Sequence, residues 1–142
     1  MTSRELENLV EVGQLKRAPV NDGEIAGLVR SGEARLMDAA NMLLSLESRF
    51  DLAYNAAHAL ALAALRRQGY RSDKRYTVFQ TLPHTLGLSA PIWRLLTKCH
   101  GLRNQWEYEG TVDLDERLVT DLISAVEGVR DALRRQTPPP GE

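Results

Sequence analysis

One polar face on an otherwise apolar segment holds the first group of side chains that could do chemistry. Between Phe50 and Leu65 nearly every residue is apolar, and the main exceptions are Asp51, Tyr54, Asn55 and His58. In a helix these four side chains share one face about a quarter-turn wide. Buried polar groups need hydrogen-bond partners, so this face should meet water, a ligand or polar groups of a neighbouring helix. Two interpretations stay open: the exposed edge of a core helix, or one wall of a binding groove.

A second segment carries an arginine near the middle of an apolar helical face. The apolar residues of this face are Ile92, Leu95, Leu96, Cys99, Leu102 and Trp106. Arg103 falls among them, with His100 and Glu107 beside it. A buried guanidinium without a partner is costly. We therefore expect Arg103 to pair within the chain, for instance with Asp51 or Glu107, to lie at a subunit interface, or to line an anion-binding cleft.

Other catalytic and metal-binding signatures are missing from the sequence. Cys99 and His100 are adjacent, so they point in different directions on a helix, and Cys99 is predicted to be a core residue. The three histidines have no metal-ligand spacing, and neither a zinc motif nor a glycine-rich phosphate loop occurs. We expect no metal and no cofactor. Whether the chain is an enzyme stays open at this point.

Helices must position these side chains, because helical periodicity recurs along the chain and strand signals are nearly absent. The expected helices span about residues 3–15, 22–46, 48–68, 74–82, 91–107 and 114–135. Their expected caps and ends are Ser3, Asp22, Gly69, Ser89, Gly110 and Asp113. The sequence predicts an all-α fold, an antiparallel bundle of four to five main helices. A single domain should cover residues 1–137, with helix 3–15 at its periphery and a flexible tail over 138–142.

Composition favours a soluble globular domain. The 142 residues are 43% hydrophobic and 26% charged, an ordinary balance for a chain long enough to form its own core. The single cysteine excludes an internal disulfide framework and fits a reducing compartment. The first residues are charged, and the longest apolar run, residues 56–65, is too short to span a bilayer. We therefore expect a cytoplasmic protein without membrane contact.

Charge is unevenly spread although the formal net charge is only −1, which argues against a general polyanion binder. The charged residues within 66–75 are all basic except one aspartate. The charged residues within 107–121 are all acidic except one arginine. A solvated connector is the favoured interpretation of the basic run. A patch for a phosphate or an acidic partner is the alternative.

Two segments together resemble the HEPN superfamily. The run from Arg49 to Leu60 is similar to its second core helix, where an acidic or polar residue and an aromatic precede an alanine-rich stretch. The run from Leu102 to Gly110 looks like the leucine, arginine and asparagine near the end of its later helix. Phe79 and His84 in the intervening segment also fit. The resemblance covers residues 22–135.

The resemblance implies a helical bundle, commonly a homodimer, whose paired later helices form a cleft. Many members are metal-independent ribonucleases, often toxins partnered by a small nucleotidyltransferase-like antitoxin, and others bind nucleotides or RNA without cutting. In the cutting members a histidine follows an arginine after about four to six residues, and the two serve acid–base transfer and phosphate binding.

This chain matches the family's arginine and asparagine at Arg103 and Asn104 but not its histidine. Tyr108 stands at that distance, and His100 lies one turn before the arginine. The catalytic candidates are therefore Arg103, His100 and Tyr108. The ligand-binding candidates are Asp51, Tyr54, Asn55, His58, Arg103 and Asn104. We rank binding of a nucleotide, RNA or partner protein first, a purely structural interaction module second, and a ribonuclease toxin third.

Overall fold

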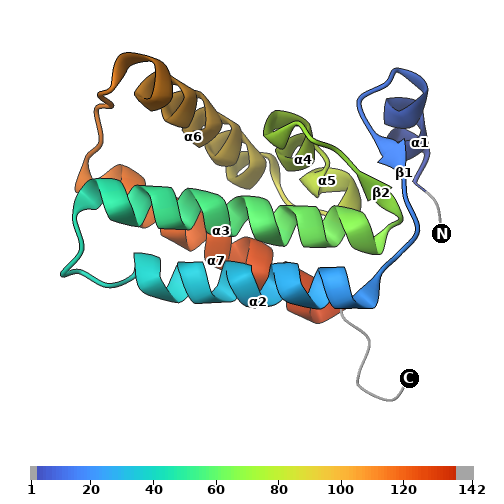
Figure 1. The fold of residues 1–142 in the computed structure, drawn as a ribbon, viewed down its shortest axis with the longest axis horizontal. Helices are drawn as coiled ribbons and strands as arrows, with labels where there is room; N and C mark the ends of the chain where they lie inside the picture. The colour runs from blue at the N-terminus through green and yellow to red at the C-terminus, as the bar shows by residue number, and fades with distance from the viewer. Residues whose placement is uncertain (1–2, 137–142) are drawn as a thin grey trace.

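Helices dominate the computed structural model, which describes residues 3–136 (Figure 1). Four are long: α2 (Asp22–Ala39), α3 (Leu46–Arg67), α6 (Ala90–Glu109) and α7 (Glu116–Gln136). Three are short: α1 (Arg4–Glu11), α4 (Arg75–Gln80) and α5 (Leu82–Thr85). Strands β1 (Lys16–Arg17) and β2 (Tyr70–Arg71) form one small antiparallel pair. The predicted all-α fold class is confirmed, and the predicted tail over 138–142 lies outside the described residues.

Helix α3 is the central element of the bundle. It runs antiparallel to α2, with α7 packed on the same side and with α4, α5 and α6 on the other (Figure 1). Its alanines are buried along most of its length, which lets neighbouring helices approach closely. Cys99 of α6 is fully buried in the same hydrophobic cluster, as its position on an apolar face predicts. No helix within residues 3–136 is long and apolar enough to cross a membrane.

Helix α2 is shorter than its apolar spacing predicts. It ends at Ala39 rather than near residue 46, and Leu43 is 94% exposed in the following turn. The Asn41 side chain accepts a hydrogen bond from the Leu43 N–H, which closes a turn. Ser45 then caps α3 by accepting from the Ser48 N–H. Local turn chemistry therefore overrides helical spacing, and the prediction of one helix over residues 22–46 is wrong.

Several other predicted boundaries also shift. Helix α1 ends at Glu11, Gly13 follows with φ of 80°, and the chain then enters β1, a strand that the sequence pattern does not reveal. The segment expected as one helix over residues 74–82 forms α4 and α5, and Pro83 lies in the first turn of α5. Asp115, rather than Asp113, caps α7 by accepting from the Leu118 N–H. Gly110 ends α6 with φ of 75°, as predicted.

Two buried arginines fasten the ends of α3. Arg49 donates to the Ala39 carbonyl at 2.9 Å and pairs with Glu116 at 2.9 Å, so it joins the end of α2 to the beginning of α7. Arg66 pairs with Glu24 at 2.5 Å and donates to the carbonyls of Ala18 and Pro19, which follow β1, and of Tyr70 in β2. The interpretation of the basic run as a solvated connector is therefore wrong for Arg66.

Close packing between α2 and α3 requires glycine at position 32. A Cβ added there would lie 2.7 Å from Leu60 Cγ and 3.3 Å from the Ala56 carbonyl oxygen. We expect Gly32→Ala to lower the free energy of unfolding by about 1–3 kcal/mol, because the fully buried Leu60 side chain would have to shift within a packed core. Urea unfolding followed by circular dichroism measures this change.

Gly27 provides the matched control on the same helix. A Cβ at this position meets nothing within 4 Å. Gly27→Ala should raise the free energy of unfolding by about 0.5–1 kcal/mol through helix propensity alone. Equal effects of the two substitutions would contradict the packing argument.

Candidate functional site

The polar face of α3 meets α4 and α6 rather than open solvent. Tyr54 is only 2% exposed and its ring packs against Phe79, with centroids 5.8 Å apart. Asp51, Asn55 and His58 are half-buried along the same face. This face is therefore a partly buried polar face, on which Tyr54, Asn55 and Asp51 each bond to a side chain of α4 or α6.

Arg103 joins α6 to α3 through a pair of carboxylates. Its Nε lies 3.0 Å from Asp51 Oδ1, and one terminal nitrogen lies 2.9 Å from Glu107 Oε1. Its guanidinium carbon is 5.6 Å from the centre of the Trp106 ring. The expected intrachain pair is thus present with both of the acidic residues that the sequence offers.

His100 lies one turn before Arg103 and bonds to Tyr54. Its Nδ1 is 2.9 Å from the Tyr54 hydroxyl oxygen, and its Nε2 is 3.2 Å from the Asn104 amide nitrogen. An amide nitrogen can only donate, so with the amide in this orientation Nε2 accepts and Nδ1 carries the proton. Burial, together with the charge of Arg75, lowers the pKa of His100. The imidazole is therefore neutral near pH 7.

Arg75 is the site residue that sequence reasoning missed. It is the first residue of α4, and its guanidinium donates to Asn55 Oδ1 at 2.9 Å. The guanidinium carbon lies 5.4 Å from the centre of the Tyr54 ring. Within residues 3–136 no carboxylate forms an ion pair with Arg75. The only signal of Arg75 in the sequence is the basic run of residues 66–75, which favours a solvated connector and leaves a phosphate or acidic-partner patch as the alternative.

These side chains surround a small polar cavity of about 190 Å³ between α3, α4 and α6. Its lining residues are Tyr54, Asn55, Arg75, His100, Arg103, Asn104 and Glu107. An adjoining cavity of about 350 Å³ is lined by Asp51, Arg103, Trp106 and Glu107. The two guanidiniums supply donors of the kind that a phosphate or carboxylate group requires, and the Glu107 carboxylate at the same cavity offsets part of their charge.

Three of the predicted site residues do not line the polar cavity: Asp51, which lines the adjoining cavity, Tyr108 and His58. Tyr108 is 90% exposed, because five positions beyond Arg103 correspond to more than a third of a turn around α6. The structure therefore does not bring Tyr108 into the cavity beside Arg103, and its catalytic role stays a prediction. His58 lies deeper along α3, edge-on to Phe79 with centroids 6.2 Å apart. Burial is the main cause that lowers the pKa of His58 to about 4.

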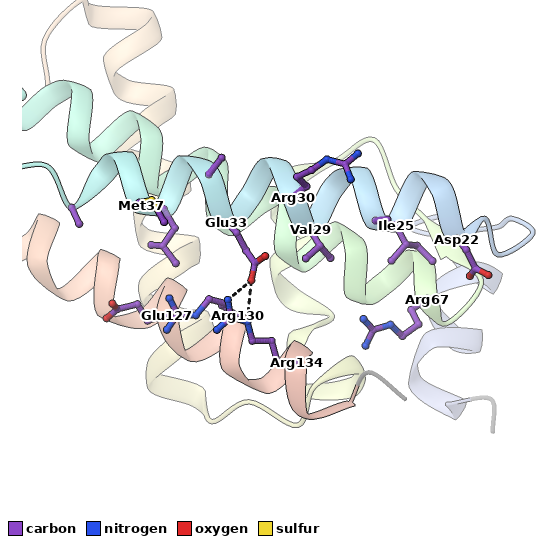
Figure 2. Close-up of a pocket in the computed structure, with 14 residues that line it drawn as sticks. Asp22, Ile25, Val29, Arg30, Glu33, Met37, Arg67, Glu127, Arg130 and Arg134 are labelled. Atoms are coloured by element: carbon purple, nitrogen blue, oxygen red, sulfur yellow. Dashed lines mark hydrogen bonds and ion pairs between the residues drawn. The ribbon is translucent and has the colours of Figure 1, made fainter. Parts of the chain in front are cut away.

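A much larger groove lies elsewhere, between α2 and α7, with a volume of about 1050 Å³ (Figure 2). Ile25, Val29 and Leu36 contribute apolar surface to it. Charged side chains stand along its edges, and Glu33 of α2 pairs with Arg134 of α7 across it. The sequence analysis did not predict this groove, because it forms between two helices far apart in the chain.

The fold and the site together define the protein as an all-α bundle with a small polar cavity, lined by two arginines and one glutamate, between its central helix and α6. Within the described part of the chain no cluster of three or more histidine, cysteine or acidic residues could hold a metal ion. The chain matches no known family, curated protein or solved structure to which it was compared.

Proposed function

We propose that the protein binds a phosphate group of a nucleotide or of RNA in the cavity between α3, α4 and α6. The observation that carries this proposal is Arg75, a guanidinium at the cavity that donates to the neutral amide of Asn55 and forms no ion pair with any carboxylate of residues 3–136. Guanidinium groups bind phosphate with two parallel hydrogen bonds, a geometry that a lone ammonium group lacks. Asn104 and Asn55 add neutral polar groups at the same cavity.

The carboxylates around Arg103 have a different part in this proposal. Asp51 and Glu107 neutralise much of its charge and hold its guanidinium against Trp106. Arg103 is then a positioned donor, while Arg75 supplies the uncompensated charge. The HEPN resemblance supports a nucleotide or RNA as ligand. On the same resemblance, we propose that the protein is a cytoplasmic homodimer and that it binds a nucleotidyltransferase-like or other partner protein.

Titration with nucleotides and short single-stranded RNA tests the site. We expect Arg75→Gln to weaken binding at least about tenfold at low salt, where charge–charge attraction is least screened. Isothermal titration calorimetry measures nucleotide affinity, and fluorescence anisotropy of labelled RNA measures RNA affinity. The matched control is Arg117→Gln, since the Arg117 side chain is 91% exposed on α7, away from the cavity lining.

Equal affinities of the wild-type protein and Arg75→Gln, or no binding of any of these ligands, would contradict the proposal. The second result would favour a structural interaction module, in which Arg103 serves only to join α3 to α6.

Metal-independent RNA cleavage is the second candidate, and one observation favours it. His100 lines the same cavity as the two arginines and is neutral near pH 7, so its imidazole can take up a proton. Incubation of RNA with the purified protein in the presence of EDTA tests this candidate. Cleavage that disappears in His100→Ala would support it, and intact RNA would remove it.

A further inference from the structure

Helix α2 carries a second surface stripe that the core and the candidate site leave unused. Its members are Gly23, Ala26, Arg30, Glu33, Met37 and Ala40, which follows directly on the last residue of the helix. Their spacing alternates between three and four residues, the repeat with which two helices pack against each other. All are exposed except the half-buried Glu33, and Met37 is 77% exposed. The stripe lies about a third of a turn from the buried residues of α2.

The stripe is complementary to itself when a second α2 runs antiparallel to the first. With a two-fold axis midway between Arg30 and Glu33, each of these residues faces the other on the second copy. The same axis places Met37 opposite Ala26 and Ala40 opposite Gly23. The facing residues are then two opposite charges (Arg30 and Glu33), a large and a small side chain (Met37 and Ala26), and two small residues (Ala40 and Gly23). Such a self-complementary patch is what a two-fold interface requires.

Both charged members of the stripe have bonding capacity left. Arg134 contacts only Glu33 Oε2, at 3.0 Å from Nε and 2.5 Å from one terminal nitrogen (Figure 2). Glu33 Oε1 is therefore available to a further donor. For Arg30 no ion pair is recorded anywhere between residues 3 and 136. A salt bridge from Arg30 to Glu33 of a second copy would be formed twice across the axis.

Five of the six stripe residues, all except Gly23, line the groove between α2 and α7, so a second copy packed on the stripe would also meet this groove. Ala26 lines the groove together with Ile25 and Val29. The Met37 side chain of the second copy, facing Ala26, would enter this apolar part of the groove. Methionine is enriched in protein–protein interfaces, and its flexible side chain fills irregular gaps.

We propose that the protein forms a two-fold homodimer in which the α2 helices of two copies pack antiparallel, centred between Arg30 and Glu33. This interface lies on the α2 side of the bundle, away from α6 and the candidate phosphate site (Figure 1). It therefore differs from the pairing through later helices that the HEPN resemblance implies. The inference does not depend on the proposed function.

Charge reversal tests the interface, with molar mass measured by sedimentation equilibrium of the full chain. We expect the wild-type protein to be a dimer at micromolar concentrations. Arg30→Glu and Glu33→Arg should each raise the dimer dissociation constant at least about tenfold, because each places like charges together at two symmetric positions. The double variant Arg30→Glu/Glu33→Arg should restore the dimer. Arg35→Glu, an exposed charge reversal on the same helix but outside the stripe, should leave the dissociation constant unchanged.

Glu33→Arg also removes the ion pair with Arg134 and could therefore destabilise the fold. Thermal unfolding of each variant, followed by circular dichroism, shows whether the variant is folded and so separates loss of the dimer from loss of folding. Folded single variants that lose the dimer, with recovery in the double variant, support the proposal. It is overturned by a wild-type monomer at about 100 µM, where typical specific dimers are already assembled. It is equally overturned by a dimer that Arg30→Glu and Arg35→Glu affect alike, or by a double variant that stays monomeric.

Discussion

Replacement of Arg66 by alanine is expected to lower the free energy of unfolding by about 3–5 kcal/mol, the largest loss from any single change considered for this protein. The guanidinium is buried at the end of α3 and donates to Glu24 Oε1 at 2.5 Å, to the Pro19 carbonyl at 2.5 Å and to the Tyr70 carbonyl at 3.2 Å. Its removal leaves these acceptors without their donor and opens a void in a packed region. Urea unfolding at pH 7 measures the loss.

Two further substitutions separate the roles of charge and hydrogen bonding at Arg66. Glu24→Gln keeps an acceptor and removes only the ion pair, so we expect a loss below about 1.5 kcal/mol. Arg71→Ala removes an exposed guanidinium from the neighbouring strand and should change stability by less than about 0.5 kcal/mol. An effect of Arg66→Ala no larger than that of Arg71→Ala would show that Arg66 does not hold the two segments together.

Lowering the pH is the second change expected to have a large effect on stability. On the polar face of α3, His58 is the group expected to cause most of this loss. Burial, with smaller contributions from Arg75 and His100, lowers the pKa of His58 from its ordinary value of 6.5 to about 4 in the folded protein. Between these two values the unfolded chain binds more protons than the folded chain, so stability falls as the pH falls from 6.5 to 4. The loss should amount to about 2–3 kcal/mol at the acidic end.

Comparison of the wild-type protein with His58→Leu isolates this contribution. Leucine is apolar and fits the contact with Phe79, and it carries no proton at any pH. Unfolding in urea at pH 7 and at pH 4.5 gives the loss for each protein, and protonation of carboxylates contributes equally to both. We expect a clearly smaller loss in the variant. Equal losses would mean that His58 is not the group responsible.

Periodicity predicted the four long helices because each has an apolar stripe that the core requires. The burial of Cys99 and the end of α6 at Gly110 followed from the same pattern. The end of α2 did not, because Leu43 and Leu44 keep helical spacing while the Asn41 side chain turns the chain. Apolar spacing shows which residues could lie on one face of a helix. It does not show that a side-chain hydrogen bond, such as that of Asn41, ends the helix earlier.

The candidate site could be predicted only in part, for a related reason. Arg103 was identified because it stands on an apolar face, and its partner Asp51 stands on a polar face that is equally visible in the sequence. Arg75 was missed because its partner Asn55 lies twenty residues earlier, on a different helix. Arg66 was missed for the same reason, since Glu24 is forty-two residues away. Ligand, activity and partners stay predictions that the proposed experiments test.

The burial of Cys99 has a practical consequence for work on this protein. Its thiol is enclosed where α6 packs into the core, and burial raises its pKa to about 12. A protonated and enclosed thiol reacts hardly at all with alkylating reagents or oxidants. Any modification of the chain's only sulfhydryl therefore reports molecules in which α6 has come away from the core. The native sequence already contains one chemical reporter of opening, and no label needs to be introduced.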